Sequence, residues 1–174
     1  MSVNEQHSVD ETSDREILIS RLYAAPRELI WSAWTDPRHI VHWWGPTGFR
    51  TTIEVMDVRP GGVWKHVMHG PDGRDFPNQC VFLEVVKPER LVYSHGGGRK
   101  GDPEAQFEAT WTFVLEGHGT RVTNRMLFKS KEERDRVAEF YGAIEGGRQT
   151  LERLAGYLLA VDSSNSPAPW RAPR

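Results

Sequence analysis

Three side chains in the sequence could move a proton within apolar surroundings. His66 and His95 each lie in a stretch of alternating apolar residues, and Glu145 lies beside two glycines in an apolar periodic segment. An imidazole can serve as acid or base near neutral pH, and a partly buried carboxyl group can acquire a raised pKa that suits the same role. Acid–base catalysis is therefore one possibility, although Glu145 could equally pair with Arg148 or point to solvent.

Metal and thiol chemistry are not indicated. His66 and His69 are three apart in a predicted strand and must face opposite sides of it. His39 and His42 could share one side of a helix, but no third ligand follows nearby. Cys80 is the only cysteine, so no disulfide can form within the chain, and a buried inert thiol is the favoured interpretation. We predict no metal and no cofactor.

Aromatic residues suggest a binding chamber. The chain has 7 Trp among 174 residues, and rings of this size need a place to bury their area. Alternation puts several aromatic and polar residues on shared strand faces, namely Trp64, His66 and Met68; Tyr93 and His95; Trp111 and Phe113. These faces either line an apolar chamber with a few polar groups, the usual character of a small-molecule site, or simply fill the core.

The elements that would position these residues begin with one strand and two helices. Alternation predicts a strand over Glu16 to Tyr23. Ala25-Pro26 starts a helix with an apolar stripe at Leu29, Ile30, Ala33 and Trp34. Thr35-Asp36-Pro37 ends it and caps a second short helix that runs through Trp43 and Trp44.

Six further strands and one long helix follow. Glycine- and proline-rich turns separate strands predicted at 50–58, 62–69, 75–86, 90–95, 106–116 and 119–128. Apolar residues then recur every three or four positions, which predicts one helix from Lys131 to Val161, with Ser130 and Glu133 as a capping box. We expect an α+β fold in which a curved antiparallel sheet, in β-α-α-β6-α order, wraps around the long C-terminal helix.

Composition indicates one soluble domain without a nucleic-acid partner. The net charge is −2, and no cluster of Lys and Arg suited to phosphate is visible. We predict disordered segments at 1–14 and 162–174 around a domain at 15–161, with Trp170 either loose in the tail or docked. The polar N-terminus lacks a signal peptide and no stretch could span a membrane, so we expect a cytoplasmic protein.

The order and spacing of short motifs across 16–161 give a resemblance. The motifs are Pro26 to Trp31, Trp43 to Pro46, Asp57 to Gly62, His69 to Gly73, Pro88 to Leu91, Gly119 to Thr123 and the terminal Gly142 to Leu158. Together they resemble the START-like (SRPBCC) superfamily and, within it, the activator of heat-shock-protein-90 ATPase homologue-like, or polyketide-cyclase-like, family. The resemblance implies a helix-grip fold that holds a hydrophobic ligand between sheet and helix.

One position departs from the family pattern. Gly147 stands where the family often carries a bulky aromatic residue, and it follows Gly146 on the inward stripe of the predicted helix. A helix-interior glycine costs about 1 kcal/mol relative to Ala, so the pair needs a reason. Either the helix packs closely on the sheet or the paired tryptophans, or the missing side chain enlarges a cavity.

The leading functional hypothesis is binding of a small hydrophobic or aromatic molecule without catalysis. The predicted ligand-binding residues combine the aromatic faces with helix positions, and are Trp34, Trp44, Trp64, His66, Met68, Tyr93, His95, Trp111, Phe113, Tyr141, Glu145 and Gly147. The alternatives are a cyclase- or hydrolase-like enzyme using His66, His95 or Glu145, and a chaperone-ATPase-activator-like module. The chaperone role ranks third, since the segment before Glu16 is too short for the co-chaperones' additional domain. A homodimer is possible.

Overall fold

The computed structural model describes residues 13–163. The segments predicted to be disordered, and with them Trp170, lie almost wholly outside these residues. The exceptions are Ser13 and Asp14, in a short 3-10 turn that leads into the first strand, and residues 162–163, at the end of the last helix.

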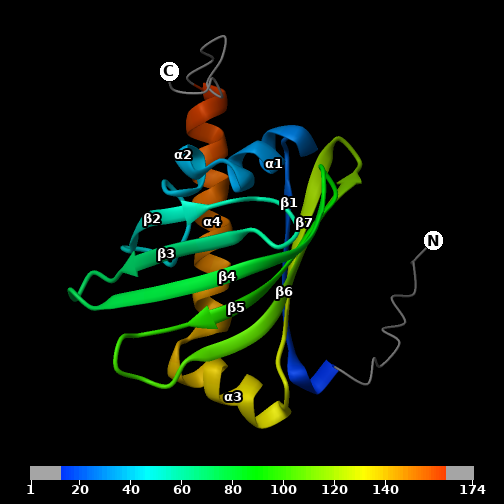
Figure 1. Ribbon diagram of the computed structural model, residues 1–174. Coiled ribbons are helices and arrows are strands. Elements are labelled where there is room, and N and C mark those ends of the chain that lie inside the picture. The colour runs from blue at the N-terminus through cyan, green and yellow to red at the C-terminus, as the bar shows by residue number, and fades with distance from the viewer. Residues whose placement is uncertain (1–12, 164–174) are drawn as a thin grey trace.

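Seven strands form one antiparallel sheet in the order β1-β7-β6-β5-β4-β3-β2, so the first strand pairs with the last (Figure 1). The strands are β1 (Glu16–Tyr23), β2 (Arg50–Met56), β3 (Val63–His69), β4 (Asp75–Val86), β5 (Arg90–Gly97), β6 (Ala105–Glu116) and β7 (Gly119–Leu127). All seven were predicted, because apolar alternation and turn residues agree along this part of the chain.

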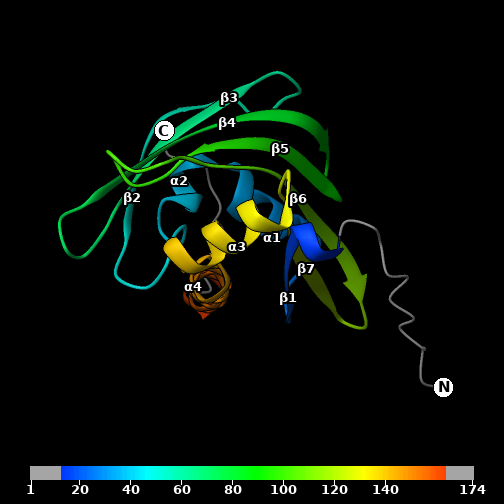
Figure 2. The same cartoon turned by 90° about the horizontal axis from the view of Figure 1, so that it is seen from below.

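Four helices cover the concave face of the sheet. They are α1 (Arg27–Thr35), α2 (Pro37–Ile40), α3 (Lys131–Phe140) and α4 (Ala143–Ser163). The long helix α4 lies along the concave face, α1 and α2 close one end of the fold, and α3 lies at the other end (Figures 1 and 2). This is the predicted α+β arrangement of a curved sheet wrapped around a C-terminal helix.

The prediction of one helix from Lys131 to Val161 was wrong. Gly142 has φ +60°, a left-handed conformation that ends α3 and that glycine adopts at little cost. A new helix begins at Ala143, and the Gly146 N–H donates to the Gly142 carbonyl at 2.8 Å. The break turns α3 across the end of the sheet, while α4 runs along its face. Apolar periodicity continues through the break and so did not reveal it.

Helix caps agree with the sequence, although the second helix is shorter than predicted. The Ser130 hydroxyl accepts the Glu133 N–H at 3.1 Å, and the Asp36 carboxylate accepts the Arg38 N–H at 2.9 Å. Helix α2 ends at Ile40, and a turn rather than a helix carries Trp43. The Trp43 indole N–H donates to the Ala33 carbonyl at 3.1 Å, which fixes this turn on α1.

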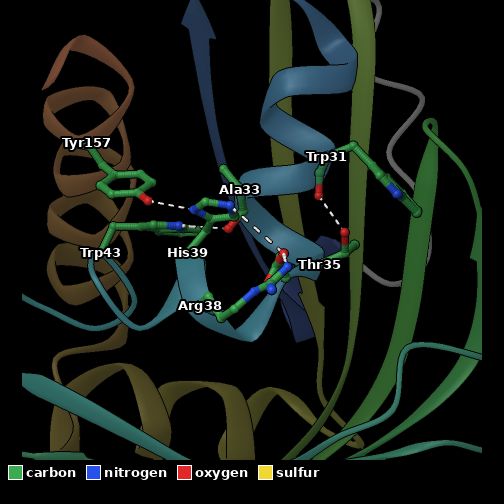
Figure 3. A network of polar contacts seen from close by, with 8 residues as sticks. Trp31, Ala33, Thr35, Arg38, His39, Trp43 and Tyr157 are labelled. Atoms are coloured by element: carbon green, nitrogen blue, oxygen red, sulfur yellow. Dashed lines mark hydrogen bonds and ion pairs between the residues drawn. The ribbon is translucent and has the colours of Figure 1, made fainter. Parts of the chain in front are cut away.

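A polar network ties α4 to the end closed by α1 and α2 (Figure 3). The Tyr157 hydroxyl lies 2.8 Å from His39 Nδ1, and the other ring nitrogen of His39 faces the Asp36 carboxylate at 3.9 Å. The His42 ring stacks on Tyr157. Burial lowers the pKa of His39 and raises that of Tyr157, so both groups are neutral at pH 7 and their contact is a hydrogen bond.

No helix within residues 13–163 combines the length and the apolar character that crossing a membrane requires.

Candidate functional site

One half of the concave face is filled by aromatic side chains. Trp34 on α1 is fully buried and lies at the centre of this cluster. Its ring centroid lies 5.2–6.2 Å from five other aromatic rings, those of Trp44, Trp64, Phe82, Tyr93 and Trp111. Contacts of this kind add to the area that each ring buries, so this half of the interior is solid.

The other half of the concave face holds a cavity of about 180 Å³. Its walls come from β3 to β7, the turn after α2, and the junction of α3 and α4. Most lining residues are apolar or aromatic, and they are Trp44, Gly45, Pro46, Phe49, Met68, Phe76, Tyr93, Gly97, Gly98, Ala105, Phe107, Trp111, Met126, Val137, Tyr141, Ala143, Gly146 and Gly147. The remaining five are polar but carry no formal charge, namely His66, Asn78, His95, Asn124 and Thr150.

Small residues on the first turns of α4 leave this space open. Ala143, Gly146 and Gly147 face the cavity, whereas Leu151 and Leu154, further along the helix, are buried in the core. A Cβ at Gly147 would lie 2.2 Å from Ile19 Cδ1, and one at Gly146 would lie 3.3 Å from Pro46 Cγ. Close packing of α4 on β1 thus accounts for the lack of a side chain at 147, and both glycines also line the cavity.

Two histidines in the cavity wall are uncharged at neutral pH. Burial lowers the pKa of His66 to about 3, with a smaller contribution from the nearby His95, and burial lowers the pKa of His95 to about 4. His95 Nδ1 lies 3.5 Å from the Cys80 sulfur, and burial raises the pKa of that thiol above its usual range. The Cys80 sulfur keeps its proton and orients the imidazole rather than acting as a nucleophile.

Two polar atoms in the cavity wall lack a hydrogen-bond partner among residues 13–163. They are Asn124 Oδ1 and His66 Nδ1, and both atoms are inaccessible to bulk solvent. The indole N–H groups of Trp34 and Trp64 also lack partners, but these rings lie in the solid half and do not line the cavity. By contrast, Asn78 donates to the Phe76 carbonyl at 2.8 Å.

Partly exposed aromatic rings form the mouth of the cavity. Phe76 packs edge-on against Phe49 at 5.4 Å and against Tyr141 at 6.4 Å. The Tyr141 hydroxyl donates to the Pro103 carbonyl at 2.7 Å, and the ring lies so close to Gly98 that a Cβ there would meet the hydroxyl at 2.3 Å. The helix break at Gly142 thus places Tyr141 against the loop between β5 and β6.

A half-buried guanidinium fixes the turn that carries Trp44. Arg153 on α4 donates through Nη1 to the carbonyls of Trp44, Gly45 and Pro46 at 3.2, 2.9 and 3.1 Å. Burial lowers the pKa of this arginine, which still remains charged at neutral pH. The arrangement holds the Trp44 ring over the cavity at its border with the solid half.

The structure brings eight of the twelve predicted site residues to the cavity wall. They are Trp44, His66, Met68, Tyr93, His95, Trp111, Tyr141 and Gly147. Trp34, Trp64 and Phe113 share the inward face but lie outside the lining, because neighbouring rings surround them at the filled end. Alternation identifies the face of a strand, and not the position along it where the helix leaves a gap.

The placement of Glu145 in the site was wrong. Its side chain is 67% exposed and faces Arg148 at 3.9 Å, on the outer side of α4. The register of α4 is set by Gly146 and Gly147 facing inward, and the adjacent position at 145 therefore points away. The ion pair with Arg148 is the alternative that the sequence had left open.

Several cavity residues escaped the sequence analysis. Asn124 could have been found, because it lies between Val122 and Met126 on the inward face of β7, where a polar residue interrupts apolar alternation. Asn78 interrupts β4 in the same way. No local signal marks Phe49, because it lies outside the predicted strands and helices. Arg153, which supports the turn beside the cavity, has the sequence pattern of a solvent-exposed helix residue.

Residues 13–163 contain no group of three or more His, Cys, Asp or Glu side chains arranged to hold a metal ion. The cavity wall offers neutral nitrogen and oxygen atoms with apolar surface between them. Apolar walls with a few polar groups are the usual character of small-molecule sites.

A curved sheet closed around one long helix, with an apolar cavity between them, is the helix-grip arrangement of START-like proteins. The chain matches the family described as Activator of Hsp90 ATPase homolog 1-like protein over residues 24–159, and it belongs to that family. Family and fold together define a ligand-binding fold. A search of curated proteins gave no significant match.

Solved structures from three bacteria share the fold. A Mycobacterium smegmatis protein is 27% identical with a TM-score of 0.77, and the match covers 86% of this chain and 94% of that one. An Arthrobacter aurescens protein is 26% identical with a TM-score of 0.77, covering 86% and 88%. A Nitrosomonas europaea protein is 28% identical with a TM-score of 0.71, covering 83% and 94%.

Proposed function

We propose that the domain predicted over residues 15–161 binds a small, uncharged, apolar or aromatic molecule in the cavity between the sheet and α4. The observation that carries this proposal is the cavity of about 180 Å³, walled mostly by apolar side chains and lined on α4 by Gly146 and Gly147. Burial of apolar ligand surface would drive binding at about 25 cal/mol per Å².

The volume limits the size of the ligand. An apolar cavity of about 150 Å³ accommodates benzene, so about 180 Å³ suits one aromatic ring with a small substituent. Aromatic rings that could contact such a ligand line the cavity, namely Trp44 and Trp111 together with Phe49, Phe76 and Tyr141.

The enzyme alternative has less support. Glu145 is too exposed to act inside the cavity, and general acid–base catalysis works best when the pKa of the group lies near the working pH. The pKa values of about 3 for His66 and about 4 for His95 make both rings weak bases. The chaperone-activator role, the homodimer and the cytoplasmic location stay predictions.

Binding of toluene to the purified protein tests the proposal. We expect saturating toluene to raise the melting temperature and to change the tryptophan fluorescence, because it binds the folded state alone and contacts Trp44 and Trp111. Ala105→Leu, which places a larger side chain in the buried wall, should abolish both effects.

Ala24→Leu is the matched control, since this alanine is exposed in the turn between β1 and α1. Circular dichroism would verify that each variant folds. Absence of toluene binding to the wild-type protein, or equal binding by a folded Ala105→Leu variant, would contradict the proposal.

A further inference from the structure

We propose that the cavity selects an uncharged aromatic molecule carrying a hydroxyl or N–H group, and that this group donates a hydrogen bond to Asn124 Oδ1. The inference rests on the proposed function and adds the chemical class of the ligand. It depends on one atom in the wall and on the charge of the wall as a whole.

Asn124 supplies an acceptor that no described residue uses. Its Oδ1 is buried and without a partner, while the side chain faces the cavity from β7. In the sheet, Asn124 lies opposite Ile19 on β1 and opposite Trp111 on β6. It therefore lies between the isoleucine that packs on Gly147 and a tryptophan of the cavity wall.

A carbonyl oxygen can only accept a hydrogen bond, so the group that satisfies Asn124 must be a donor. A ligand without a donor would leave this buried oxygen without a hydrogen bond, whereas a ligand with a donor would gain one. His66 Nδ1, the other unpartnered atom in the wall, can donate or accept according to its tautomer. Of the two unpartnered wall atoms, Asn124 Oδ1 is thus the one that requires a donor from the ligand.

The wall also selects against charge. None of the described residues that line the cavity is Asp, Glu, Lys or Arg. Arg153 lies behind the turn that carries Trp44 and does not line the cavity, and its Nη1 donates to three backbone carbonyls of that turn. A carboxylate or ammonium ligand would lose its hydration and gain no counter-charge, which makes its transfer into this space strongly unfavourable.

A series of single-ring probes tests the inference on the intact chain. The probes are toluene with no polar group, anisole with an acceptor alone, p-cresol with a donor, and p-toluate with a negative charge. In the wild-type protein we expect p-cresol to bind about tenfold more tightly than anisole, from the hydrogen bond to Asn124. We expect no measurable binding of p-toluate at neutral pH.

Asn124→Leu should remove the preference for p-cresol over anisole and leave toluene binding at least as tight as in the wild-type protein. Thr123→Leu is the matched control, because this neighbour on β7 lies on the opposite face of the sheet, where its hydroxyl lies 3.1 Å from Ser20 Oγ, and the change should leave the preference unchanged. Isothermal titration or ligand-observed NMR would provide the dissociation constants.

The outcomes separate the two proposals. If toluene does not bind, the proposed function fails. If toluene binds but p-cresol and anisole bind the wild-type protein equally, or if p-toluate binds as well as p-cresol, this inference alone is overturned. The affinities of the four probes for the wild-type protein test the inference even if the Asn124 variant does not fold.

Discussion

The two halves of the concave face share one sheet and one helix, but one half is filled by side chains and the other contains a cavity. At the end nearer α1, Trp34 fills the space between sheet and helix, and Leu151 and Leu154 of α4 are buried with it. At the other end, α4 presents Gly146 and Gly147, and a cavity of about 180 Å³ remains.

The difference between the two halves follows from the size of a few residues on α4. The inward faces of β3 and β5 run continuously through both halves, with Trp64 followed by His66 and Tyr93 followed by His95. What changes is the size of the opposing helix residues. Because interiors are packed to nearly constant density, a hollow of this size is maintained only where rigid neighbours cannot collapse into it. The close contact of α4 with Ile19 provides that rigidity.

The largest effect is expected from truncation in the solid half. Trp34→Ala should lower the free energy of unfolding by about 3–5 kcal/mol, because it removes a fully buried ring that touches five others. Trp44→Ala, at the border of the cavity, should cost about half as much, since one side of its ring faces open space. Urea unfolding measures both values, and equal losses would mean that the two halves do not differ in packing.

Acid should weaken the hollow half. The pKa values of about 3 for His66 and about 4 for His95 lie below the ordinary value of 6.5, so the unfolded chain takes up these protons first as the pH falls. Above about pH 6.5 these two groups do not affect the free energy of unfolding. As the pH falls below about 6.5, the free energy of unfolding decreases by up to about 1.4 kcal/mol per pH unit for each histidine.

Urea unfolding at pH 7, 6 and 5 tests this dependence. Replacing both residues, His66→Phe with His95→Phe, should flatten the decline between pH 7 and pH 5. His118→Gln, in the exposed turn between β6 and β7, is the control and should leave the decline as it is. An unchanged slope in the double variant would refute the assignment of buried neutral histidines.

A smaller effect is expected from Gly147→Ala. The added Cβ would lie 2.2 Å from Ile19 Cδ1, and overpacking should outweigh the gain in helix propensity, for a net loss of about 1 kcal/mol. Ile19→Val removes the opposing Cδ1 and should restore stability in the double variant.

Gly156→Ala is the matched control on the same helix. A Cβ there meets nothing within 4 Å, so this change should stabilise the protein by up to about 1 kcal/mol. Equal stabilisation by Gly147→Ala, measured by thermal unfolding, would show that the contact with β1 is looser than described.

Much of the fold could be read from local pattern. Alternation placed all seven strands, and the caps at Ser130 and Asp36 followed from residue types that satisfy free N–H groups. The missed break at Gly142 marks the limit of that approach, because a glycine in a periodic segment is compatible with either a helix interior or a left-handed stop.

The site was predicted less completely. The predicted residues His66, His95 and Trp111 line the cavity, whereas Trp34, Trp64 and Phe113 lie in the core. Arg153 was missed because its partners, the carbonyls near Gly45, are distant in the sequence. Asn124 was missed because its Oδ1 stands out only by lacking a hydrogen-bond partner in the folded chain.

The sequence by itself determined which strand residues face inward, since the strand period assigns each side chain to a face, and it determined that residue 147 has no side chain. Only the tertiary structure decided where the interior is solid and where it is hollow. That outcome depends on how far α4 approaches β1 and on which rings from α1 reach the sheet, and both are set by contacts between segments distant in the chain.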